Sequence, residues 1–131
     1  MSDTINTPST MWRVVKREGH GNIAVEESPV PTLAPTQVLV RAQRSLISRG
    51  SEIWRRYARD EAVEHRIMGY SLAGVVERVG EAVEEFSPGD RVAALAPHAQ
   101  YVALEVVDPP HRPSLVKLPD SVSFEAGTFW P

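Results

Sequence analysis

The chain has 131 residues, of which 42% are hydrophobic and 24% are charged, and its formal net charge is -3. These values are typical of one ordinary domain with a single core, and they exclude the basic excess of a protein that binds nucleic acid or a membrane surface. The chain contains no cysteine, which excludes disulfides and thiolate metal sites.

The first ten residues, MSDTINTPST, are polar and lack the apolar core of a secretory signal. We expect them to form a disordered lead over residues 1–10. The apolar runs elsewhere are only a few residues long, which is too short for a membrane span. A cytoplasmic location is the default expectation for such a chain.

The next segments alternate as strands do. Met11–Lys16 is rich in β-forming residues, a Gly-His-Gly-Asn turn follows, and Ile23–Glu27 alternates like a return partner, which predicts a hairpin. Residues 28–35 contain three prolines, which exclude a helix and a central strand. Gln37–Ser45 has the period of a half-buried strand, with Val38, Val40 and Ala42 on one face and Leu39, Arg41 and Gln43 on the other.

Ser51–Ala62 is the best candidate for a helix. Ser51 is a good N-cap residue, and Glu52 suits the positive end of the helix dipole. An apolar stripe at helical spacing predicts the buried face; it consists of Ile53, Trp54, Tyr57 and Ala58.

Short strands separated by turns fill most of the remaining chain. The turn at Phe86–Asp90 has Pro and Gly where a type II turn needs them. Four further strands are predicted at Ser71–Val79, Arg91–Leu95, Gln100–Val106 and Leu115–Leu118, and Ser123 is expected to start a helix. So many short strands with regular turn signals predict an all-β barrel or sandwich.

An ordered set of motifs extends over nearly the whole chain. GVVERVG at 74–80, FSPGDRV at 86–92, YV at 101–102 and KLPD at 117–120 occur in this order, after P-x-P at 29–31. This set resembles the N-terminal half of the medium-chain dehydrogenase/reductases. The resemblance implies a mainly β, GroES-like, partly open β-barrel with one or two short helices over residues 11–122. In that family the barrel forms the substrate side of the active site, and NAD or NADP binds in a following Rossmann domain.

The Rossmann fingerprint, G-x-G-x-x-G between a strand and a helix, does not occur in this chain. Gly19 and Gly21 are spaced closely enough, but they fall in the predicted hairpin turn. We therefore expect the Rossmann domain to be missing, and we expect this chain alone to bind no nicotinamide cofactor.

Residues 123–131 are interpreted as the start of a linker helix towards that missing domain. The segment ends on bulky apolar residues, so a truncated fragment that is inactive alone is expected. Its aromatic residues would lack their cover, which predicts either self-association through the tail or folding of the tail over the barrel; they are Phe124, Phe129 and Trp130.

Zinc-dependent members of the family carry a cysteine before a Gly-Thr/Ser-Asp segment and a histidine in Gly-His-Glu. Here Ser48 or Arg49 occupies the cysteine position, and Tyr70 stands in place of the histidine, with Ser71 after it. None of these is a plausible zinc ligand. The resemblance is therefore to the metal-free branch, which includes quinone and enoyl reductases, and no zinc is expected.

The candidate catalytic residues are Tyr70, Ser51 and Arg49, and Ser48 and His98 are expected to border the substrate cleft. In a metal-free reductase, Tyr70 could orient a carbonyl, enone or alcohol substrate and donate a proton, Ser51 could relay one, and Arg49 could offset negative charge. The alternatives are structural: Tyr70 packs on the barrel end, and Ser51 only caps a helix.

Two functions remain open. The chain is expected to be either the substrate-side domain of a zinc-independent NAD(P)-dependent oxidoreductase, or a stand-alone, non-catalytic GroES-like binding module. A co-chaperonin would share only the barrel, and a fold by itself does not carry function.

Overall fold

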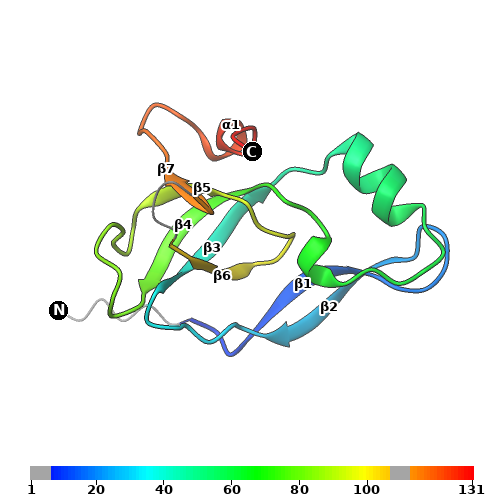
Figure 1. Ribbon diagram of the computed structural model, residues 1–131, viewed down its shortest axis with the longest axis horizontal. Coiled ribbons are helices and arrows are strands. Elements are labelled where there is room, and N and C mark those ends of the chain that lie inside the picture. The colour runs from blue at the N-terminus through cyan, green and yellow to red at the C-terminus, as the bar shows by residue number, and fades with distance from the viewer. Residues whose placement is uncertain (1–6, 107–112) are drawn as a thin grey trace.

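The computed structural model describes residues 7–106 and 113–131, in which the chain folds mainly as antiparallel strands (Figure 1). The first two strands form a hairpin, and the others form a second sheet in the order β6-β3-β4-β5-β7. This arrangement confirms the predicted mainly β, half-barrel architecture. The strands are β1 (Thr10–Lys16), β2 (Ile23–Pro29), β3 (Gln37–Ser45), β4 (Leu72–Val79), β5 (Arg91–Ala94), β6 (Tyr101–Glu105) and β7 (Leu115–Lys117).

The helices are short. They are η1 (Arg49–Tyr57), η2 (His65–Ile67) and α1 (Phe124–Gly127). Among residues 7–106 and 113–131, no helix has the length and apolarity needed to cross a membrane. The predicted disorder of residues 1–10 falls largely outside the described part of the chain, which begins at residue 7.

The alternation of β3 places a different core on each of its faces. Val38 and Val40 are buried in the main core between the strands of the five-stranded sheet. Leu39, on the opposite face, is fully buried against Met11 and Tyr101. The predicted half-buried strand is therefore wrong for the first half of β3, because the segment around β1 covers the face that was expected to be exposed.

The β1–β2 turn holds the C-terminal end of η1. Gly21 N donates to Tyr57 O at 2.7 Å, and Gly19 N donates to Asp60 O at 2.6 Å, so turn amides satisfy carbonyls that a helix end leaves unpaired. Lys16, which is 1% exposed, donates to the carbonyls of Arg17, Gly19 and Glu61. The predicted hairpin turn is confirmed, and its function here is to anchor the loop that carries η1.

The C-terminal segment folds back onto the main sheet, where α1 lies beside β3, β4 and β5 (Figure 1). Ser123 caps α1 as predicted, since its hydroxyl accepts from Ala126 N at 3.0 Å. The Arg91 guanidinium lies 4.5 Å from the centre of the Phe124 ring. The expectation that the tail aromatics lack cover is therefore wrong for Phe124, whereas Phe129 is 72% exposed.

Candidate functional site

Three chain segments that carry the predicted site residues converge at one end of the main sheet. Leu46 N donates to Ser71 O at 3.1 Å, so the segment after β3 lies beside the start of β4. Ala96 N donates to Tyr70 O at 3.3 Å, and His98 N donates to Met68 O at 2.9 Å, so the segment after β5 lies on the other side of it. These bonds bring residues 46–52, 68–71 and 96–98 together.

A buried carboxylate, Glu52, lies at the centre of this convergence. It is 2% exposed, and His98 is 6% exposed. The Glu52 Oε1 atom lies 2.5 Å from His98 Nε2 and 2.8 Å from the Tyr57 hydroxyl, and Oε2 accepts from Ser48 N at 2.7 Å. The carboxylate therefore joins the start of η1, its last residue and the loop after β5.

The hydrogen bonds also determine the roles of the groups around Glu52. A carboxylate only accepts, so Tyr57 and His98 Nε2 must donate to it. Burial, followed by the hydrogen bond to Glu52 and the charge of Glu52, raises the pKa of Tyr57 well above its usual value, so Tyr57 stays a protonated donor. With the hydrogen on Nε2, the other ring nitrogen, Nδ1, faces Ser45 Oγ at 2.8 Å.

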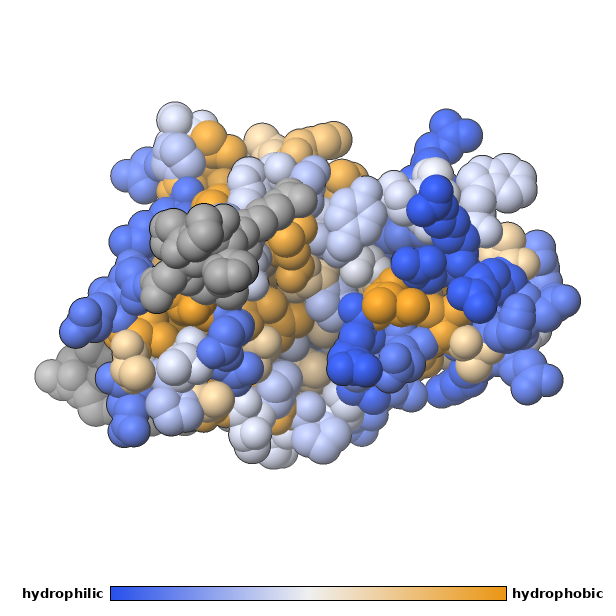
Figure 2. Space-filling model, viewed as in Figure 1, coloured by the Kyte–Doolittle hydropathy of each residue, from blue (hydrophilic) through white to orange (hydrophobic). Residues whose placement is uncertain are grey.

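Helix η1 is π-helical, and it buries Glu52 instead of the predicted apolar stripe. Ala58 N donates to Ile53 O, five residues back, which is π-helical spacing. The predicted apolar stripe is wrong as a buried face, because Ile53 is 40% exposed and Trp54 is 77% exposed. Glu52 is the residue of η1 that is buried. Figure 2 shows that the end of the molecule that holds η1 and the β1–β2 turn is mainly hydrophilic.

The three residues of Gly69-Tyr70-Ser71 have different environments. Gly69 has a φ of +107°, and a Cβ atom there would lie 2.6 Å from the His98 ring. The Ser71 hydroxyl is buried and donates to Thr128 O beneath the C-terminal segment. Tyr70 is 42% exposed, so its side chain is the one that solvent or a ligand can reach.

The predicted catalytic residues, Tyr70, Ser51 and Arg49, lie on two of the converging segments, but their side chains do not contact one another through a hydrogen bond or an ion pair in the described part of the chain. Ser51 is half-buried and Arg49 is exposed. The interpretation of Ser51 as the N-cap is wrong, because Ser48 caps η1 and its hydroxyl lies 3.4 Å from Ser51 N.

Sequence reasoning missed Glu52 and Tyr57 as parts of this centre. Glu52 was assigned only to the helix dipole, and Tyr57 was assigned to the apolar stripe. Their partner His98 lies 46 residues from Glu52 along the chain. A local pattern cannot reveal such a contact, although an acidic residue beside a capping serine was a signal that could have been followed.

Several hollows border the strands. One of about 260 Å³ lies beside the buried pair and is lined by Ser45, His98, Gln43 and Gln100, among others. A second, of about 480 Å³, is lined by Met11, His65 and Tyr101, among others, and burial together with the charge of Arg13 lowers the pKa of His65 there.

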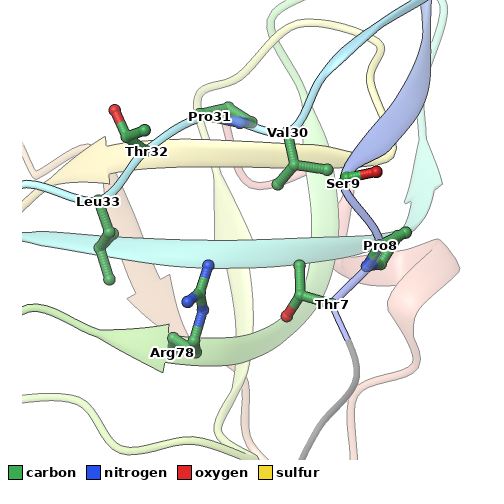
Figure 3. Close-up of a pocket in the computed structure, with 8 residues that line it drawn as sticks. All are labelled: Thr7, Pro8, Ser9, Val30, Pro31, Thr32, Leu33 and Arg78. Atoms are coloured by element: carbon green, nitrogen blue, oxygen red, sulfur yellow. The ribbon is translucent and has the colours of Figure 1, made fainter.

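The third hollow, of about 490 Å³, lies between the N-terminal segment and the proline-rich stretch (Figure 3). Arg78 reaches it from β4, and the other lining residues are uncharged. None of the predicted site residues lines it, so it is separate from the Glu52 centre. Its lining residues are Thr7, Pro8, Ser9, Val30, Pro31, Thr32, Leu33 and Arg78.

The side chains at this centre do not fit a zinc ion. The hydroxyl and guanidinium groups of Ser48, Arg49, Tyr70 and Ser71 are not ligands that zinc prefers, since zinc binds thiolate, imidazole and carboxylate groups. Among the described residues, no group of three or more His, Cys, Asp or Glu side chains is arranged to hold a metal ion. The carboxylate of Glu52 and the imidazole of His98 are hydrogen-bonded to each other, so this pair is already engaged.

The chain is similar to oxidoreductases over most of its length. The alcohol dehydrogenase GroES-like domain family matches residues 34–107. A trans-enoyl reductase of Alternaria alternata, ACTTS2, is 33% identical over 125 residues, which are 86% of this chain and 34% of that protein. A sorbitol dehydrogenase of Mus musculus is 37% identical over 79 residues, 57% of this chain and 22% of that one.

A solved structure gives the same likeness. The quinone oxidoreductase of Pseudomonas syringae pv. Tomato DC3000 superposes with a TM-score of 0.68 at 28% identity, over 90% of this chain and 36% of that one. The chain therefore spans about a third of the length of the enoyl reductase and of the quinone oxidoreductase.

Proposed function

The chain belongs to the alcohol dehydrogenase GroES-like domain family of the medium-chain dehydrogenase/reductases, and on this premise we propose that it is the substrate-side domain of a zinc-independent NAD(P)-dependent reductase. Its substrates would be carbonyl or enone compounds, with alcohols in the reverse direction. The observation that carries the proposal is the exposed Tyr70, which stands where a zinc-dependent relative has its ligand histidine.

Each residue of the proposed site has a role that its position supports. A nicotinamide cofactor, held by a nucleotide-binding domain outside this chain, would supply the hydride. Tyr70 orients the substrate oxygen and donates the proton, Ser51 relays a proton, and Arg49 offsets negative charge. Ser48 and His98 border the cleft and hold Glu52 between them, at 2.7 Å from Ser48 N and 2.5 Å from His98 Nε2.

The relatives support a reductase more than an alcohol dehydrogenase. The enoyl reductase matches 86% of this chain, whereas the sorbitol dehydrogenase matches 57%. The quinone oxidoreductase shares the fold over 90% of the chain. Reduction of an activated double bond or a quinone needs a proton donor and an oriented oxygen, and a tyrosine hydroxyl can provide both.

The activity is tested with the protein encoded by the whole reading frame that contains this chain. We expect it to oxidise NADH or NADPH in the presence of quinones or enones. Tyr70→Phe should lower kcat by about a hundredfold, since it removes a general acid. Ser87→Ala removes an exposed hydroxyl at the Phe86–Asp90 turn and serves as the control. An unchanged kcat in Tyr70→Phe would remove Tyr70 from the mechanism.

Failure of the whole protein to bind NAD(P)H would favour the other function, a non-catalytic GroES-like binding module. A calorimetric titration decides between them. We expect the 131-residue chain alone not to bind NAD(P)H appreciably, because its glycine pair lies in the β1–β2 turn and not at a helix start. Micromolar affinity of the isolated chain would contradict that expectation.

Zinc independence is tested separately by metal analysis. We expect no stoichiometric zinc after purification in zinc-containing buffer, because the carboxylate and imidazole of the centre, Glu52 and His98, are hydrogen-bonded to each other and the side chains of Ser48, Arg49 and Tyr70 are poor ligands. Activity of the whole protein should also survive a chelator. About one tightly held zinc per chain, lost in Tyr70→Phe or His98→Ala, would show that a zinc site exists.

A further inference from the structure

We propose that Ser45, His98 and Glu52 form an acyl-transfer site in which Ser45 is the nucleophile and small activated esters or thioesters are the acyl donors. Ser45 Oγ lies 2.8 Å from His98 Nδ1, and His98 Nε2 lies 2.5 Å from Glu52 Oε1. A hydroxyl, an imidazole and a carboxylate in this order are the arrangement that activates serine for attack on an acyl carbon.

The hydrogen bonds around Glu52 impose the direction that this chemistry needs. Glu52 accepts from Ser48 N, the Tyr57 hydroxyl and His98 Nε2, so its oxygens are held in place from three sides. In the neutral ring with its hydrogen on Nε2, which is the form that the proposed reaction uses, Nδ1 accepts the Ser45 proton. Burial of Glu52 and His98, at 2% and 6% exposure, keeps water from competing for these bonds.

Ser45, in contrast to its two partners, is accessible. It is the last residue of β3 and is exposed, and with His98 it lines the hollow of about 260 Å³. That volume suits a short acyl group rather than a long chain. Gln100 lines the same hollow, and its Oε1 accepts from Trp12 N at 2.8 Å, which leaves its amide NH₂ to donate to an oxyanion.

The reaction balances with these groups alone. Ser45 Oγ forms a bond to the acyl carbon while its proton moves to His98 Nδ1, and the tetrahedral oxyanion then re-forms the carbonyl. The bond to the leaving alkoxide or thiolate breaks, and His98 returns the proton to that leaving group. The product is an acyl ester of Ser45 and a free alcohol or thiol, and water can release the acid by the same steps. No oxidant or cofactor is required.

This site shares His98 and Glu52 with the border of the proposed reductase cleft, but its chemistry does not rest on the reductase function. It uses neither Tyr70 nor a nicotinamide, and the isolated chain contains all of its groups. A negative result in the reductase assay therefore leaves it standing, and the reverse also holds.

The test uses the purified 131-residue chain and p-nitrophenyl acetate. We expect a burst of nitrophenolate that is stoichiometric with protein, and mass spectrometry should place the acetyl group on Ser45. Ser45→Ala, an exposed substitution that should leave the fold intact, should abolish the burst. Ser87→Ala, at another exposed serine, should leave it unchanged.

The contribution of His98 is measured in two ways, because His98→Gln could fail to fold. In a folded His98→Gln variant, acetylation of Ser45 should slow by about a hundredfold, as for loss of a general base. In the unchanged chain, unfolding in urea should slow the same acetylation by a similar factor, because His98 then no longer contacts Ser45. A Ser45 rate equal to that of Ser87, or equal in the folded and unfolded chains, would overturn the proposal.

Discussion

Glu52→Ala is expected to lower the free energy of unfolding by about 3–5 kcal/mol, because a buried polar group left without its partner costs about 1–3 kcal/mol and three groups lose their acceptor. The substitution leaves His98 Nε2, the Tyr57 hydroxyl and Ser48 N without their acceptor. Each of these donors then remains buried or half-buried without its partner. The loss is large, because the whole free energy of unfolding of a protein is only about 5–15 kcal/mol.

The measurement is urea unfolding followed by tryptophan fluorescence. Glu81→Ala is the matched control, because Glu81 is an exposed glutamate in the turn after β4, and its loss should change stability by less than about 0.5 kcal/mol. Glu52→Gln keeps the shape of the side chain and one acceptor oxygen, so its effect should fall between the two. A Glu52→Ala variant as stable as the Glu81 control would show that the buried network does not hold η1 in place.

Gly69→Ala is expected to destabilise the chain by about 2–5 kcal/mol in total. At a φ of +107°, a side chain is strained by about 1–2 kcal/mol. The new Cβ would also lie 2.6 Å from His98 Cδ2 and Nε2, and overpacking of this kind costs about 1–3 kcal/mol more. Because His98 is held at both nitrogens, by Ser45 and by Glu52, the ring cannot move aside without losing a hydrogen bond.

Gly89→Ala separates the two contributions. Gly89 has a φ of +96°, and no atom lies within 4 Å of the Cβ that alanine would add, so this variant carries the backbone strain without the contact. In a His98→Ala background, the Gly69→Ala effect should fall to that of Gly89→Ala. If it stays at its full size there, the imidazole is not the group that requires glycine at position 69.

The prediction of the strands from the sequence succeeded for a physical reason. The signals for a strand are the alternation of apolar and polar residues with a period of two and the turn residues at its ends, and both are local in the sequence. Gln37–Ser45 was predicted with the bounds that β3 has. The Phe86–Asp90 turn also agrees, since Gly89 has a positive φ and Asp90 N donates to Ser87 O at 3.1 Å. The ordered motifs likewise identified the family that the comparisons show.

The prediction of the helix at η1 was wrong in both of its bounds and in its buried face, because a helix over Ser51–Ala62 was expected and the structure has Arg49–Tyr57. Propensity and spacing predicted a regular helix from Ser51 with the stripe around Ile53 and Trp54 inside. The helix instead begins at Arg49, directly after its N-cap Ser48, and ends with a π-type hydrogen bond from Ala58 N to Ile53 O, five residues back. The anchor at its C-terminal end comes from the β1–β2 turn, through Gly21 N and Tyr57 O, and no local signal contains that contact.

By itself, the sequence determined the mainly β fold and the family. Each of these follows from local patterns or from the order of motifs. Only the tertiary structure decided which polar groups form a centre. His98 lies 46 residues from Glu52 and 53 residues from Ser45 along the chain. It meets them only because the end of β3, the start of β4 and the end of β5 lie side by side. Burial then turns an ordinary glutamate and histidine into a directed pair, because groups shielded from water must satisfy each other.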